Sequence, residues 1–165
     1  MRIWVMRHGE ASFNAKTDNQ RTLTEYGQKT AFKQGQWLAK RFSDQQVSLD
    51  KILVSPYLRT QQTLEQVLAG MQAVSSVQSF ANVARMIESW DGITPGGNLD
   101  NVLNYLDFLR SEGAKNILLI SHLPLVYNLT QALTHFQHSV HFYPAVIAEV
   151  DWQTDNGKLI VTESP

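Results

Sequence analysis

Cysteine is absent from this chain of 165 residues. Its absence excludes disulfide bonds, thiolate catalysis and zinc sites with cysteine ligands, and it is consistent with a reducing compartment. Low-complexity tracts and internal repeats are also absent. The apolar run at the N-terminus is too short for a signal peptide, and no run is long enough to span a bilayer. We therefore expect a soluble, cytoplasmic protein that folds as one domain over residues 1–165.

An excess of charge of one sign is lacking as well. The 14 lysine and arginine residues are balanced by 15 aspartate and glutamate residues, which leaves a formal net charge of −1. This balance argues against an extended surface for nucleic acid or membrane. The four tryptophans are scattered and do not alternate with basic residues, as a platform for stacking bases would require. Any phosphate binding must therefore come from a local cluster of basic groups.

Apolar runs and amphipathic segments alternate along the chain, and this order is typical of an α/β fold. Short apolar runs predict strands at residues 2–6, 51–54 and 116–120, and around 77–80 and 83–87. Segments with an apolar stripe predict helices at residues 24–42 and 55–70, from a cap at Asn98 or Asp100 to about 110, and from the turn at 121–124 to about 134. Residues 146–152 and 158–162 predict a terminal hairpin. The expected fold is a three-layer α/β/α sandwich with a mainly parallel central sheet and an antiparallel C-terminal hairpin at or near an edge.

Two of the expected helices have clear start signals. Thr24 is the predicted N-cap of a helix that runs to about Phe42. Ser55 is the predicted N-cap of the next helix and Pro56 its first residue. We expect that helix to end near Gly70 because glycine commonly follows the last helical turn.

Basic groups follow three of the predicted strands. Arg7 and His8 follow the first strand, Arg59 comes soon after the second, and His122 comes soon after the third. Because the carboxyl ends of parallel strands lie along one edge of a sheet, we expect these four side chains to meet in one crevice. Two guanidinium groups and two imidazoles would repel each other there unless the crevice binds an anion. A phosphoryl group fits, because arginine binds its oxygens in pairs, and Gly9 would let the backbone approach it closely.

Three histidines at a spacing of three, His135, His138 and His141, suggest a metal site on one helix face. However, the chain near His141 is predicted to approach a strand, and no cysteine or nearby carboxylate completes a coordination shell. We favour a solvated helix end and loop, in which His141 could flank the substrate surface.

Three carboxylates are candidate Mg²⁺ ligands for a phosphate-handling site: Glu10, Asp18 and Asp91. The two arginines of the expected crevice already neutralise phosphoryl charge, which is what the ion would do. We therefore predict neither a metal nor any other cofactor.

The motifs resemble those of the histidine phosphatase superfamily, also called phosphoglycerate-mutase-like. The first is Arg7-His8-Gly9 with Asn14 seven residues after Arg7. The later motifs appear in the family's order at residues 23–28, 55–64 and 121–122. A closer resemblance, over nearly the whole chain, is to the SixA-type phosphohistidine phosphatases, and it includes Arg21 ahead of Leu23, residues 94–97 and residues 120–126.

The resemblance implies a role for each matched residue. His8 would be the nucleophile that takes the phosphoryl group and becomes a phosphohistidine intermediate. Arg7, Arg59 and His122 would bind and neutralise the phosphoryl oxygens, and the motif residues Asn14, Arg21 and Gly9 would contact the substrate. A neutral imidazole must attack, so a backbone carbonyl or another acceptor is expected to hold the second N–H of His8.

The general acid of many superfamily members has no secure match here, since neither Glu88 nor Asp91 has the expected spacing. An alkoxide leaves poorly without a proton donor, whereas the P–N bond of phosphohistidine is labile. The segment 71–97 is also short, which predicts an open crevice that admits a protein side chain. The expected partner is the phosphorylated histidine phosphotransfer domain of a sensor-kinase relay, and a monomer is favoured.

Two alternatives stay open beside this prediction. The same site could hydrolyse a small phosphomonoester, and Asn14 fits sugar-phosphate and mutase members of the superfamily too. A module that binds a phosphoprotein without turning it over is the other alternative. The intact set of Arg7, His8, Arg59 and His122 argues against that module, because a pure binding protein needs no nucleophile.

Overall fold

The computed structural model describes residues 1–74 and 82–165. Within these ranges, one sheet contains β1 (Arg2–Arg7), β2 (Lys51–Val54), β3 (Ile87–Ser89), β4 (Asn116–Ser121), β5 (Ile147–Trp152) and β6 (Gly157–Glu163). The strand order is β3-β2-β4-β1-β5-β6. β3, β2, β4 and β1 are parallel, whereas β5 runs antiparallel to β1 and β6 antiparallel to β5. The mainly parallel sheet with an antiparallel C-terminal hairpin at its edge is therefore confirmed.

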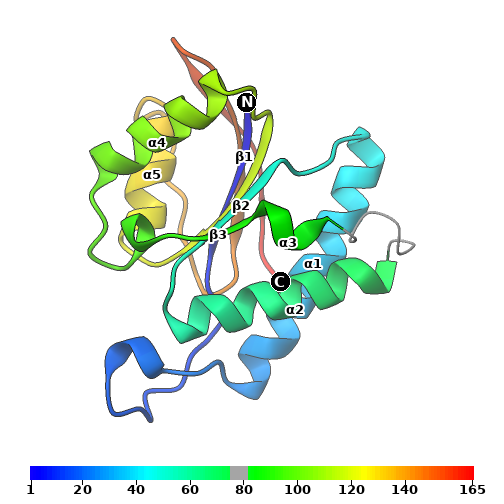
Figure 1. Cartoon of the computed structure of the whole chain (residues 1–165), viewed down its shortest axis with the longest axis vertical. Helices are drawn as coiled ribbons and strands as arrows, with labels where there is room; N and C mark the ends of the chain where they lie inside the picture. Colours follow the sequence, from blue (N-terminus) through cyan, green and yellow to red (C-terminus); the bar gives the residue numbers. More distant parts are fainter. Residues whose placement is uncertain (75–81) are drawn as a thin grey trace.

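Helices cover both faces of this sheet, which confirms the three layers (Figure 1). One face carries α1 (Glu25–Gln45) and α2 (Leu58–Val74), with the short α3 (Val83–Met86) beside them. The other face carries α4 (Leu99–Ser111) and α5 (Leu125–Leu133). Two 3₁₀ turns, η1 (Asp18–Gln20) and η3 (Asp91–Ile93), lie in the loops. None of the helices in the described ranges is both long enough and apolar enough to cross a membrane.

Alternating side chains of the central strands divide the core between the two helical layers. In β1, Trp4 and Met6 pack in the cluster that contains residues of α1 and α2, while Ile3 and Val5 pack in the cluster that contains residues of α4 and α5. Trp4 meets Phe42 of α1 edge to face, with ring centres 4.9 Å apart. Successive strand residues point to opposite faces, so a continuously apolar run is the pattern that a doubly covered strand requires. Burying each large side chain in this way contributes roughly 1.5–3 kcal/mol.

The predicted bounds of the second helix are wrong at both ends. α2 begins at Leu58, and Ser55 instead accepts a 3.3 Å hydrogen bond from the Tyr57 N–H in the turn before it. α2 also continues past Gly70 to Val74. A Cβ at Gly70 would lie only 2.0 Å from the carbonyl oxygen of Phe32 on α1. Gly70 therefore permits the close crossing of two helices and does not terminate one.

The middle of the chain also differs from the prediction. Residues 83–87 were expected to form a strand, but Val83–Met86 is one helical turn and β3 begins at Ile87. Ile87 pairs with Ile52, the second residue of β2. Most of residues 83–86 therefore lie before the start of β2 and have no strand beside them with which to form backbone hydrogen bonds. The strand expected around 77–80 lies outside the described residues.

Candidate active site

The loops that follow β1, β2 and β4 meet at the carboxyl edge of the sheet. Backbone hydrogen bonds continue the sheet beyond the strands, from the His8 N–H to the Ser121 carbonyl (3.0 Å) and from the Ser55 N–H to the Ile120 carbonyl (3.2 Å). The ring centres of His8 and His122 consequently lie 5.2 Å apart. Arg59 Nε lies 3.4 Å from His8 Nε2. The convergence predicted from the sequence is confirmed for these side chains.

His8 is a buried, neutral imidazole with one defined tautomer. Its Nδ1 lies 2.7 Å from the carbonyl oxygen of Gly9, and because a carbonyl only accepts, Nδ1 carries the proton. The expected backbone acceptor is therefore present. Burial, with the nearby charges of Arg59 and Arg7, lowers the pKa of His8 to about 4, although the bond to Gly9 opposes this shift. The Nε2 lone pair is left to face the Arg59 N–H.

His122, the second imidazole of the crevice, is buried as well. Its Nε2 lies 2.8 Å from the Ser55 hydroxyl, and the Tyr57 ring packs against it edge to face at 5.1 Å. Burial, with the neighbouring His8 and Arg59, lowers the pKa of His122 to about 3. Ser55, interpreted above only as a helix cap, thus orients an active-site imidazole.

Guanidinium groups give the crevice its positive charge. Arg7 Nη1 donates to the Phe142 carbonyl at 2.8 Å, which ties the loop before β5 to the site. Arg59 is 4% exposed. Burial lowers the pKa of Arg7, and the neighbouring charges of Arg59 and Arg21 lower it further. Arginine nevertheless stays charged at neutral pH, so the crevice is suited to a dianion such as a phosphoryl group.

The loop between β1 and α1 holds the other two predicted contact residues. Arg21 is linked to the cluster through Asp18, whose Oδ1 lies 3.2 Å from Arg21 Nη1. The Arg21 guanidinium also lies 4.2 Å from the centre of the Phe13 ring. Asn14 lies exposed on the same loop, where its backbone N–H donates to the Ser12 hydroxyl at 3.1 Å. The structure therefore brings Arg21 to the cluster and leaves Asn14 on the outer part of the loop.

Gly9 packs closely against the first turn of α1. A Cβ at this position would lie 2.8 Å from the carbonyl oxygen of Gly27 in the first turn of α1. The Gly9 N–H is occupied by the Thr63 hydroxyl at 3.0 Å, and its carbonyl by His8. Close packing against α1 therefore requires glycine here, and the approach of the Gly9 backbone to a phosphoryl group stays a prediction.

Neither candidate acid contacts the two histidines. Glu88 lies in the middle of β3, where its carboxylate accepts from the Tyr105 hydroxyl and pairs with Lys51 at 3.0 Å. Lys51 begins β2, so this pair lies away from the carboxyl edge. Asp91 is exposed in η3, just beyond β3. Across the described parts of the chain, no carboxylate forms a hydrogen bond or ion pair with His8 or His122.

The histidines at 135, 138 and 141 form no metal centre in the structure. α5 ends at Leu133, and all three side chains lie exposed in the loop that leads to β5. The described residues contain no group of three or more histidines, aspartates and glutamates that could hold a metal ion. The expected solvated loop is confirmed.

Asp18, Thr63 and Ser55 are site neighbours whose contacts sequence reasoning missed. Asp18 was considered only as a Mg²⁺ ligand, yet its carboxylate lies 3.1 Å from Arg59 Nη2. Its spacing of three from Arg21 is a local signal for an ion pair. Nothing local signals its contact with Arg59, which lies 41 residues further along the chain.

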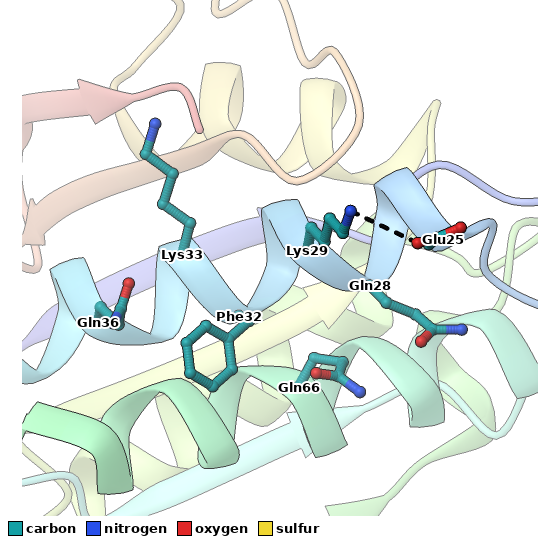
Figure 2. Close-up of a pocket in the computed structure, with 7 residues that line it drawn as sticks. All are labelled: Glu25, Gln28, Lys29, Phe32, Lys33, Gln36 and Gln66. Carbon is teal, nitrogen blue, oxygen red and sulfur yellow. Dashed lines mark ion pairs between the residues drawn. The ribbon is translucent and has the colours of Figure 1, made fainter.

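A separate hollow of about 590 Å³ lies between α1 and α2. Figure 2 shows its lining, in which Phe32 of α1 lies opposite Gln66 of α2 and Lys29 pairs with Glu25 at 3.4 Å. Its lining side chains come from these two helices alone and include neither histidine of the crevice. This hollow therefore does not extend the site at the sheet edge.

Both active-site imidazoles are expected to resist protonation. A histidine in the unfolded chain takes up its proton near pH 6.5, whereas His8 does so at about 4 and His122 at about 3. Between pH 6.5 and about 4 the unfolded state therefore binds more protons than the folded state. The free energy of unfolding should consequently fall as the pH is lowered through this range. ¹⁵N chemical shifts of the imidazoles at pH 5.5 would check this directly. A His8 ring protonated at that pH would contradict the neutral tautomer.

Comparison with known proteins agrees with this geometry. Residues 3–95 match the model of the histidine phosphatase superfamily (branch 1). A phosphohistidine phosphatase SixA homolog of Haemophilus influenzae is 42% identical over 99% of this chain and 96% of its own length. Phosphohistidine phosphatase SixA of Escherichia coli is 35% identical over 91% of this chain and 84% of its own. The structure of the protein histidine phosphatase SixA complexed with tungstate aligns with a TM-score of 0.83 and 33% identity, covering 100% of this chain and 97% of the other. The chain therefore belongs to branch 1 of the histidine phosphatase superfamily.

Proposed function

We propose that this protein is a phosphohistidine phosphatase that removes the phosphoryl group from a histidine phosphotransfer domain of a sensor-kinase relay. The observation that carries the proposal is the state of His8. Its imidazole is neutral, its Nδ1 proton is held by the Gly9 carbonyl, and its Nε2 faces Arg59 at 3.4 Å. This is the arrangement required of a nitrogen nucleophile beside a phosphoryl-binding guanidinium. The names of the SixA relatives support phosphohistidine as the substrate.

The reaction follows from these groups in two steps. The Nε2 lone pair of His8 attacks the phosphorus, and the P–N bond of the substrate breaks. The electron pair of that bond passes to the substrate ring, whose other nitrogen carries a proton, so the ring leaves as neutral imidazole. Arg7 and Arg59 neutralise the equatorial oxygens, and His122 donates an N–H to them. Water then attacks phosphorylated His8, which releases inorganic phosphate and returns its electron pair to Nε2. A bound dianion also favours the protonated form of the nearby imidazoles, which opposes their low pKa in the free enzyme.

Among the described residues no carboxylate contacts His8 or His122, and this supports a P–N substrate. An alkoxide leaving group needs a proton in the transition state, whereas imidazole is a much better leaving group. The described residues place Glu88 in an ion pair with Lys51 and leave Asp91 exposed in η3. The site is thus better matched to phosphohistidine than to a phosphate ester.

Exposed apolar side chains on the segments that form the crevice support a protein as the carrier of that phosphohistidine. Each segment that forms the crevice exposes one. Phe13, on the loop after β1, is 84% exposed, and Tyr143, next to the Phe142 that holds Arg7, is 71% exposed. Leu58 and Leu123, the neighbours of Arg59 and His122, are 36% and 39% exposed. Exposed large apolar side chains on the segments beside a site are available to contact another molecule.

A comparison of rates tests the proposal. Purified protein would be given a phosphorylated histidine phosphotransfer domain, and separately a panel of phosphomonoesters that includes a sugar phosphate and phosphoglycerate. We expect rapid loss of phosphohistidine and slow turnover of the esters, with and without chelator. Efficient ester hydrolysis beside inert phosphohistidine would contradict the proposal and would indicate a general acid such as Asp91.

The same experiment also tests whether the exposed apolar residues beside the crevice contact the phosphoprotein. Tyr143→Ser should raise KM for the phosphoprotein by roughly 10-fold, because burying a large apolar side chain contributes about 1.5–3 kcal/mol. Hydrolysis of phosphoramidate, a small P–N compound, should be unchanged. Phe108→Ser is the matched control, since Phe108 is 54% exposed on α4. Equal effects of both variants on KM would show that Tyr143 does not contact the partner.

A further inference from the structure

Asp18 holds Arg59 through two of its oxygens. Its main-chain carbonyl accepts from Arg59 Nη1 at 2.7 Å, and its carboxylate Oδ2 accepts from Arg59 Nη2 at 3.1 Å. The other carboxylate oxygen lies 3.2 Å from Arg21 Nη1. The Asp18 side chain is 58% exposed, whereas that of Arg59 is only 5% exposed. An exposed residue of the β1–α1 loop thus contacts a buried arginine in the first turn of α2.

The contacts use one particular edge of the guanidinium. Its five N–H groups lie in a plane, and four of them form two parallel pairs, one along the Nη1–Nη2 edge and one along the Nε–Nη2 edge. Asp18 occupies the Nη1–Nη2 edge of Arg59. Nε on the other edge lies 3.4 Å from His8 Nε2. Holding the first edge therefore turns the second towards the atom that would carry the phosphoryl group.

We infer that Asp18 is a positioning residue, which orients the Nε–Nη2 edge of Arg59 towards a phosphoryl group on His8. This inference rests on the proposed function only in taking His8 as the acceptor of that group. Without the carboxylate, Arg59 Nη2 loses its partner and the guanidinium gains rotational freedom. Small misplacements of a charge-stabilising group cost a large part of its effect, because the donors must match the oxygens in the transition state.

The opposite role for Asp18 makes a different prediction. A carboxylate bound to two arginines could act as an internal anion that competes with phosphate. Its removal would then tighten the binding of oxyanions. The orienting role predicts weaker binding, because a mobile guanidinium must be ordered by the ligand itself. The sign of the change in oxyanion affinity therefore separates the two roles without any turnover.

The experiment compares Asp18→Ala and Asp18→Asn in the wild-type and Arg59→Lys backgrounds. Hydrolysis of phosphoramidate and calorimetric binding of tungstate are the two readouts. Asp18→Ala should lower kcat about 10- to 100-fold and weaken tungstate binding about 10-fold, with a smaller change in KM than in kcat. Asp18→Asn keeps one acceptor oxygen and should recover part of the loss. In the Arg59→Lys background, Asp18→Ala should cost less than roughly 3-fold, because lysine has no planar edge to orient.

Asp107→Ala is the matched control. Asp107 pairs with Arg110 three residues along α4, as Asp18 does with Arg21, and its side chain is 66% exposed. This control should leave kcat, tungstate affinity and melting temperature unchanged.

Three results would overturn the inference: an unchanged kcat in Asp18→Ala, an equal loss in the Arg59→Lys background, or tighter tungstate binding. Failure of the proposed function would show differently, as a wild-type protein that leaves P–N bonds intact, and tungstate binding would still report on Asp18.

Discussion

His8→Asn should abolish substrate turnover and covalent labelling of the enzyme together. The neutral Nε2 of His8 is the nucleophile in the proposed reaction, and asparagine offers no nitrogen that can carry a phosphoryl group. Removing a nucleophile of this kind lowers kcat by at least roughly 10⁴-fold. Rapid-quench experiments with ³²P-labelled phosphohistidine protein would measure both effects. The label on the wild-type enzyme should be stable in alkali and labile in acid, as expected of phosphohistidine.

His138→Asn is the matched control for that substitution. His138 is an exposed histidine of the loop before β5, so its loss should leave rate and labelling unchanged. Labelling of the His8→Asn enzyme would show that another residue is the nucleophile. His122 is then the first candidate, because its ring centre lies 5.2 Å from that of His8. An enzyme that turns over without any label would point to direct attack by water.

The largest effect on stability is expected at Glu149 of β5. Its side chain is fully buried, and its carboxylate accepts from Trp4 Nε1, Arg2 and Arg41, each at 2.8 Å. Glu149→Gln keeps the shape but places an NH₂ group against a guanidinium. Breaking a buried, hydrogen-bonded pair in this way should lower the free energy of unfolding by about 2–4 kcal/mol. Denaturant unfolding at pH 7 would measure the loss.

Glu25→Gln is the control for this prediction. Glu25 pairs with Lys29 at 3.4 Å, but both side chains are largely exposed, so the loss should be below about 0.5 kcal/mol. Similar losses in the two variants would mean that the cluster around Glu149 contributes no more than a surface pair.

The effect of Glu149 should also depend on pH in a defined direction. Burial alone raises the pKa of this carboxyl, but the hydrogen bonds from Arg41, Trp4 and Gln45 outweigh burial, and the pKa lies below its usual value of 4.5. The unfolded state therefore binds more protons as the pH falls through that value. The difference in the free energy of unfolding between wild type and Glu149→Gln should be largest at neutral pH and should shrink below about pH 4.5. A difference that grows in acid would contradict this sign.

Local patterns in the sequence were enough to predict five of the six described strands, all but β3, and the meeting of basic residues at the carboxyl edge of the sheet. The apolar runs around Ile3, Ile52 and Ile117 are strands, and the basic residues that follow them meet, as parallel strands require. Such predictions succeed because strand periodicity and the residues at a strand's end are read within a few positions of the chain. The tautomer of His8 was also predictable as a requirement, although the sequence did not name Gly9 as the acceptor.

Only the tertiary structure decided which residues support that edge. Gly70 has the local appearance of a helix end, yet its lack of a side chain serves the crossing with α1. Glu149 lies within an apolar run, and its arginine partners lie 147 and 108 residues away. Asp18 and Arg59 likewise come from different elements, 41 residues apart. These contacts depend on how loops and helices pack over the sheet, and non-local packing leaves no periodic signal in the sequence.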